Sequence, residues 1–157
     1  MSTRAVYTFS DEDTAPIHVY KHHDGYPYAP FDNGEAGGLL WIKKAKELAW
    51  ELPRFEADEF AASFVAANKA KGGGVFITED PHSHADAEYW YKIKPAVPAL
   101  DVWVDVYEVD WSRNPTSTLI MEGALSELIS SERLRHCPFI EDGLTEADEL
   151  NRSCDDA

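Results

Sequence analysis

The sequence has little of what disulfide-stabilised and membrane-spanning proteins require. It contains two cysteines, Cys137 and Cys154, with no CxxC pair, which is too few for a disulfide framework. No apolar run approaches the ~20 residues that span a bilayer. The opening segment, MSTRAVYTF, also lacks the apolar core of a signal peptide. We therefore expect a protein of the cytoplasm, with no membrane partner.

Basic residues are scarce. The chain has 14 Lys and Arg against 29 Asp and Glu, which gives a net charge of −15. Phosphate contacts need Lys and Arg, so direct binding of nucleic acid or of an anionic membrane is disfavoured. The acid excess lies outside residues 39–71, which hold five acids and six bases. The charge therefore favours a basic protein surface as the partner.

Sequence motifs of the common enzyme classes are missing as well. The chain has no GxSxG, no GxGxxG, no Walker loop and no HExxH. The KGGGV run lacks the Lys-Ser/Thr of a phosphate loop and follows a helical pattern instead of preceding one. With 29 acids, a carboxylate near a histidine arises by chance and carries no information. We expect a protein that is not an enzyme and has no cofactor.

One spacing resembles a metal site. In His82-Ser-His84-Ala-Asp86, an extended backbone would place both histidines on one face. Zinc and iron sites need three or four ligands, and no pattern brings His22 or His23 to this segment. We therefore expect an exposed loop without metal, where replacing His82 and His84 by alanine changes stability by only a few tenths of a kcal/mol.

Hydrophobic periodicity predicts the fold class. Period-two alternation predicts a hairpin and four later strands, and helical periodicity predicts two long helices and a short C-terminal one. The expected strands cover 4–9, 15–23, 75–79, 88–94, 101–111 and 118–122, and the expected helices 39–52, 56–71 and 123–135. This order predicts an α+β domain over residues 1–144, with a mainly antiparallel sheet and two helices packed on one face. Residues 145–157 are expected to form an acidic turn or tail.

The helical stripes predict which side chains fill the core. The first stripe includes Trp41 and Leu48, and the second includes Phe60 and Phe64. Acids at the start of the second helix suit its dipole. We expect both phenylalanines to be buried.

The strand at 101–111 carries the leading candidate binding surface. Asp105 lies between Trp103 and Tyr107 on one face, and acids framed by aromatic rings attract Arg and Lys. The candidate partner-binding residues are Asp101, Trp103, Asp105, Tyr107, Glu108 and Asp110. An alternative stays open, in which Trp103 and Tyr107 pack under a helix and Asp105 protects a sheet edge.

A second hypothesis is a small-molecule or cyclic-nucleotide binding protein, a signal sponge, which could be oligomeric. Aromatic side chains would stack a base and basic side chains would hold phosphates. The candidate ligand-binding residues are Lys21, Tyr26, Tyr28, Arg54, Trp90 and Lys92. The net charge of −15 argues against an anionic ligand.

Two segments carry a resemblance to known proteins: HVYKHHDGYP, and LPRFEADEFAASFVAANKAKGGGV followed by EYWYKIK. Over residues 17–95 the chain resembles small bacteriophage and prophage proteins of unassigned function. The resemblance implies a bacterial host cell and brings no catalytic residues. It favours a counter-defence protein that acts by binding, such as an anti-CRISPR-like inhibitor or a DNA mimic.

Overall fold

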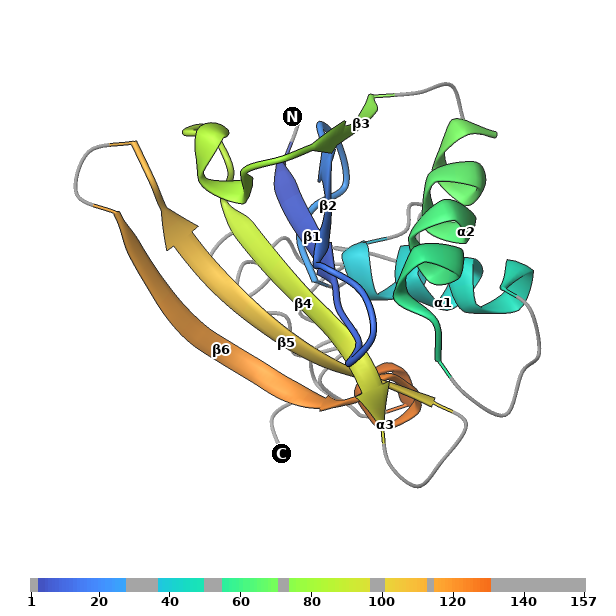
Figure 1. Cartoon of the computed structure of the whole chain (residues 1–157). Helices are drawn as coiled ribbons and strands as arrows, with labels where there is room; N and C mark the ends of the chain where they lie inside the picture. Colours follow the sequence, from blue (N-terminus) through green and yellow to red (C-terminus); the bar gives the residue numbers. More distant parts are fainter. Residues whose placement is uncertain are drawn as a thin grey trace, which may run out of the picture.

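A six-stranded sheet with helices on one side forms the body of the protein (Figure 1). The computed structural model describes residues 3–27, 37–49, 55–70, 74–96, 101–112 and 115–130. The expected tail at 145–157 and the domain boundary at 144 lie outside these residues.

The order of the elements is the predicted one, two strands, two helices, four strands and a short helix, with a 3-10 turn before the fourth strand. They are β1 (Ala5–Phe9), β2 (Ile17–Lys21), α1 (Gly38–Leu48), α2 (Ala57–Lys69), β3 (Val75–Thr78), the 3-10 turn η1 (Pro81–Ser83), β4 (Tyr89–Ala96), β5 (Asp101–Asp110), β6 (Thr116–Ala124) and α3 (Leu125–Ser130). The predicted α+β class is confirmed.

The sheet has the strand order β3-β2-β1-β4-β5-β6. All neighbouring strands are antiparallel except the central pair, in which β1 runs parallel to β4 and Tyr7 lies opposite Tyr91. A parallel pair of strands needs a long connection. Here the connection from β1 to β4 contains β2, both long helices and the edge strand β3. The sheet is therefore mixed, and β3 and β6 are its edges.

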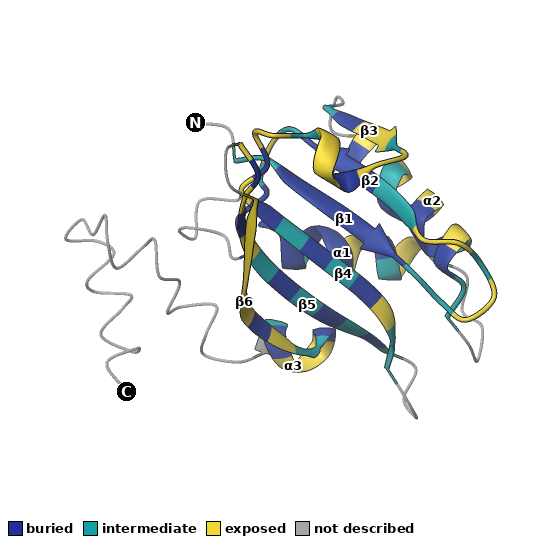
Figure 2. Ribbon diagram, turned by 60° about the vertical axis from the view of Figure 1, so that its left-hand side comes forward, coloured by how far each residue is buried: buried dark blue, intermediate teal, exposed yellow. Residues whose placement is uncertain are grey.

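The core lies between the sheet and the helices. Tyr7 and Phe9 of β1 meet Phe64 of α2, with ring centroids 4.4 and 5.4 Å apart. Phe60 and Phe64 are both buried, as predicted. Figure 2 looks onto the opposite face of the sheet. Along β4 and β5, residues that are buried alternate with residues that are half-buried, because successive side chains point to opposite faces.

The first helix is shorter than predicted. The expected helix 39–52 ends at Leu48 in the structure. Leu48 was expected in the apolar stripe, yet its side chain is 58% exposed. The predicted burial of Trp41 is confirmed, and the buried stripe of α1 runs through Leu39, Trp41, Ile42 and Ala45. Leu48 is the last residue of α1 and follows Ala45, the last buried residue of the stripe, by three positions, so its expected burial is wrong.

Asp11, in the turn between β1 and β2, stabilises the start of α2. Its Oδ2 accepts the backbone N–H of Ala57 at 2.7 Å, while Oδ1 accepts those of Asp13 and Thr14. The N-cap residue of α2, Glu56, makes no capping hydrogen bond with its own side chain.

Replacing Asp11 with alanine is expected to lower the free energy of unfolding by about 1 kcal/mol, since one helix N–H loses its acceptor. The backbone N–H of Ala57 lowers the pKa of Asp11. A lowered folded-state pKa means that this contribution is present above the unfolded pKa and is lost as pH falls through the folded one. Urea denaturation at neutral and acidic pH measures both effects. Asp13→Ala, in the same turn, is the control, and equal losses from the two variants would contradict the capping role.

Candidate binding surface

One face of the sheet carries no α-helix among the described residues, and we call it the open face. Its centre holds Trp90 and Lys92 of β4 beside Asp105 and Tyr107 of β5. A small apolar cluster lies there, made of strand and loop residues only: Val6, Tyr20, Ala87, Val109 and Trp111, with Trp90 and Tyr107 packed against it. The open face is therefore partly apolar and partly polar.

The structure places Trp103, Asp105 and Tyr107 together on this face, as alternation along β5 predicts. The alternative position under a helix is wrong, because the helices pack against the other face, where Val102, Val104 and Val106 are buried. Nor does Asp105 protect an edge, since β5 lies between β4 and β6.

Asp105 is less available to a partner than the sequence suggests. Its Oδ1 accepts the indole N–H of Trp103 at 2.9 Å, and Lys92 lies directly opposite it on β4. The Lys92 ammonium stands 4.2 Å from the ring of Trp90 and 5.0 Å from that of Tyr107. Lys92 of the chain itself therefore occupies the position between the aromatic rings and the carboxylate that a partner's cation would otherwise take.

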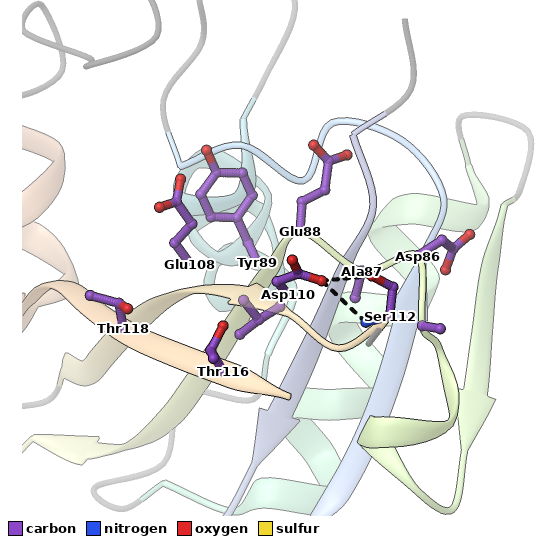
Figure 3. Close-up of a pocket in the computed structure, with 11 residues that line it drawn as sticks. Asp86, Ala87, Glu88, Tyr89, Glu108, Asp110, Ser112, Thr116 and Thr118 are labelled. Atoms are coloured by element: carbon purple, nitrogen blue, oxygen red, sulfur yellow. Dashed lines mark hydrogen bonds between the residues drawn. The ribbon is translucent and has the colours of Figure 1, made fainter. Parts of the chain in front are cut away.

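A second group of acids lies at one end of β4 and β5. There, a hollow of about 530 Å³ opens to solvent, and we call it the acidic hollow (Figure 3). Four carboxylates line it: Asp86, Glu88, Glu108 and Asp110. Cross-strand pairing explains the grouping, because Tyr89 at the start of β4 lies opposite Glu108 near the end of β5.

The four carboxylates differ in how many hydrogen bonds and ion pairs they form within the protein. Asp86 pairs with Arg4 at 2.9 Å and accepts the hydroxyl of Tyr20 at 2.9 Å. Asp110 accepts the backbone N–H and hydroxyl of Ser112, as Figure 3 shows.

The other two acids are less engaged. Glu88 accepts one long hydrogen bond, at 3.4 Å, from the backbone N–H of Arg4. Glu108 is exposed and has no ion pair with any residue that the structure describes. Glu88 and Glu108 are therefore the acids most able to bind a cation from outside.

Asp101, at the opposite end of β5, has a structural role. Its carboxylate accepts the hydroxyl and backbone N–H of Ser126 at the start of α3, and pairs with Lys46 of α1 at 3.3 Å. Only 9% of its side chain is exposed. It is therefore removed from the candidate partner-binding set, whereas Glu108 and Asp110 stay in it and Asp86 and Glu88 join them.

The residues of the expected small-molecule site do not come together. Lys21 and Tyr26 are buried on the helix side of the sheet, where the Lys21 ammonium lies 3.9 Å from the ring of Trp41. Trp90 and Lys92 lie on the open face, with the sheet between the two pairs. Tyr28 and Arg54 lie outside the described residues. The expectation that these residues form one site is wrong, because the Lys21 side chain lies on the same face of β2 as that of Val19, which points into the core.

The histidine loop is largely exposed, as expected, because His82, Ser83, Ala85 and Asp86 are all exposed, but its two histidine rings are not free of contacts. It folds over the open face, where His84 stacks on Tyr20 with ring centroids 4.0 Å apart and His82 contacts Trp111 at 4.6 Å. Replacing His84 therefore removes a packed ring, so the expected effect of a few tenths of a kcal/mol no longer applies to it. Among the residues that the structure describes, no three His, Cys, Asp or Glu side chains are placed to hold a metal.

Comparison with known proteins gives no relative from which a function could be inferred, so the function must be argued from the candidate site. No protein-family model, no curated protein and no solved structure matches this chain. Within the described ranges, no helix has the length and apolar composition needed to cross a bilayer.

Proposed function

We propose that this protein acts by binding, with the acidic hollow docked on a basic surface of another protein. The observation that carries the proposal is the grouping of Asp86, Glu88, Glu108 and Asp110 at one end of the sheet. Only one cation among the described residues, Arg4, forms an ion pair there. A Lys or Arg side chain from a partner completes this arrangement.

The partner class follows from the charge and the geometry. The net charge of −15 speeds association with basic proteins and repels nucleic acid. Proteins that bind nucleic acid present Lys and Arg to its phosphates, and an acidic protein docked on such a surface excludes the nucleic acid. The proposed role is therefore that of an acidic inhibitor of a nucleic-acid-handling complex, the counter-defence role that the phage resemblance implies.

A docking anchor fits the geometry better than a full imitation of DNA. The four hollow carboxylates form one local group, while other exposed acids, such as Glu12 and Asp13, lie in the turn at the opposite end of the sheet. Duplex DNA carries one charge per ~1.7 Å of axis along its whole length. A single basic pocket or ridge is therefore the expected contact.

The test is a pull-down from bacterial lysate across a salt series, with wild-type protein and two matched variants. Glu88→Gln/Glu108→Gln removes two charges from the hollow, and Glu12→Gln/Asp13→Asn removes two charges from the distant turn. Wild type is expected to recover a basic nucleic-acid-binding protein at low salt and to release it at high salt, because ions screen exposed charges.

The matched variants separate a docking site from general charge. The hollow variant is expected to bind the recovered protein about tenfold more weakly or worse, since each charge-assisted contact contributes about 1.5–3 kcal/mol. The turn variant is expected to bind like wild type. Equal weakening by both variants would show attraction without a site, and recovery of no basic protein at any salt would contradict the proposal as a whole.

A further inference from the structure

The edge strand β6 offers an unprotected backbone to another chain. It is nine residues long, and its first five residues are all exposed. Natural edge strands are usually protected by lysine, proline or inward-pointing charge, yet Thr116–Leu119 contains none of these. Leu119 and Ile120 are 43% and 39% exposed, which adds apolar area beside this edge.

A bulge divides the edge and defines the segment that can pair. Tyr107 of β5 lies opposite Leu119 and Val106 lies opposite Met121, so Ile120 has no partner residue. Bulges interrupt strand pairing at the point where they occur. The regular part of the edge is therefore Thr116–Leu119.

This segment borders the acidic hollow. Thr118 lies opposite Glu108 and Thr116 lies opposite Asp110, and both threonines line the hollow (Figure 3). A strand added to β6 would lie two strand spacings, about 10 Å, from β5. Threonine is short, so a long cationic side chain on the added strand passes over it towards the two carboxylates.

Charge decides which chain can occupy the edge. Residues 131–157 of the same chain hold eight acids and three bases, and a second copy of the protein carries −15. Both would bring negative charge to a hollow that already has four carboxylates. A basic segment gains attraction at the same position.

We propose that the partner adds an extended segment to Thr116–Leu119 of β6, with Lys or Arg at alternate positions directed into the acidic hollow. Backbone hydrogen bonds to the edge supply affinity, and the alternate basic side chains supply specificity. This inference rests on the proposed function, which it deepens by naming the recognition mode.

The probe is a synthetic eight-residue peptide in which Lys alternates with Val. Two further peptides carry N-methyl groups on every second backbone nitrogen, one on the Lys set and the other on the Val set. In a paired strand, only one of these sets directs its N–H groups towards β6. One methylated peptide is therefore expected to bind full-length protein at least about tenfold more weakly, while the other binds like the parent.

Two protein variants test the face of the strand. Thr118→Lys places a cation beside the acidic hollow, which Thr118 lines. Leu119→Lys places the same charge on the same edge strand, but on its other face, towards the open face of the sheet. Thr118→Lys is expected to weaken peptide binding about tenfold more than Leu119→Lys. Both positions are exposed, so both variants should fold, and circular dichroism checks this.

The outcomes separate this inference from the proposed function. If all three peptides bind equally and Glu88→Gln/Glu108→Gln weakens them all, the acidic hollow binds cations but strand addition is wrong. If no peptide shows binding that depends on these carboxylates, the proposed function fails as well. A wild-type dimer in sedimentation that Thr118→Lys dissociates would assign the edge to a second copy and overturn the inference.

Discussion

Replacing Phe64 with alanine is expected to lower the free energy of unfolding by about 4 kcal/mol, because the change leaves a cavity at the centre of the core. The Phe64 side chain is fully buried, and its ring lies 4.4 Å from that of Tyr7 and 5.4 Å from that of Phe9. It joins α2 to the central strand of the sheet. Guanidinium denaturation followed by circular dichroism measures the loss.

Val65→Ala is the matched control. Val65 is the next residue on α2 and is only partly buried, so a loss of about 1 kcal/mol is expected. If Phe64→Ala cost no more than Val65→Ala, the helix would have to be rotated on the sheet, and the assignment of the buried face would be wrong.

Replacing Lys21 with methionine is expected to raise the free energy of unfolding, by about 3 kcal/mol below about pH 7. The Lys21 side chain is 3% exposed, and its ammonium has no hydrogen-bond partner among the described residues. Burial lowers its pKa to about 7, although Asp24 nearby opposes the shift. Methionine keeps the length of the side chain without the buried charge, and the lost contact with Trp41 offsets about 1 kcal/mol of the gain.

The pH dependence has a definite sign. The folded-state pKa of Lys21 lies below its ordinary value of 10.5, so the unfolded chain holds this proton more tightly. Wild-type stability from this residue therefore rises with pH, by up to about 1.4 kcal/mol per unit between about pH 7 and 10.5. In Lys21→Met this rise is absent, so its advantage of about 3 kcal/mol should shrink as pH rises above about 7 and disappear before pH 10.5.

Lys94→Met is the control for this substitution, because it makes the same chemical change at an exposed position of the sheet. Denaturation curves at several pH values measure both variants. A Lys21→Met protein less stable than wild type at acidic pH would mean that the buried ammonium is well solvated or paired.

Local periodicity predicted the faces of the elements well. Alternation assigned Trp103, Asp105 and Tyr107 to one face of β5, which is what the structure shows. This succeeds because burial on one face of a strand repeats every second residue, which is a property of the segment alone.

Pairing between distant segments was not predictable in the same way. The parallel contact between β1 and β4 joins residues more than eighty positions apart, and no local pattern indicates it. The Asp11 cap of α2 has the same character, since it links a turn to a helix forty-six residues later. Such contacts depend on how the elements assemble.

Part of the site could have been found from the sequence. β4 and β5 are consecutive antiparallel strands, so the start of β4 must lie against the end of β5. Acids at Asp86 and Glu88 and at Glu108 and Asp110 then meet at one end. The inward position of Lys21 was also available, because it follows Ile17 and Val19 at two-residue steps.

Hydrogen exchange of the full-length protein, alone and in complex with the basic protein recovered from lysate, tests the central claim most directly. The account predicts slowed exchange in residues 85–89, 108–112 and 116–119, which surround the acidic hollow and the free edge of β6. Exchange in α1 and in the turn at 11–14 should stay unchanged. Protection confined to the helices or to that turn, with the hollow unaffected, would contradict the account.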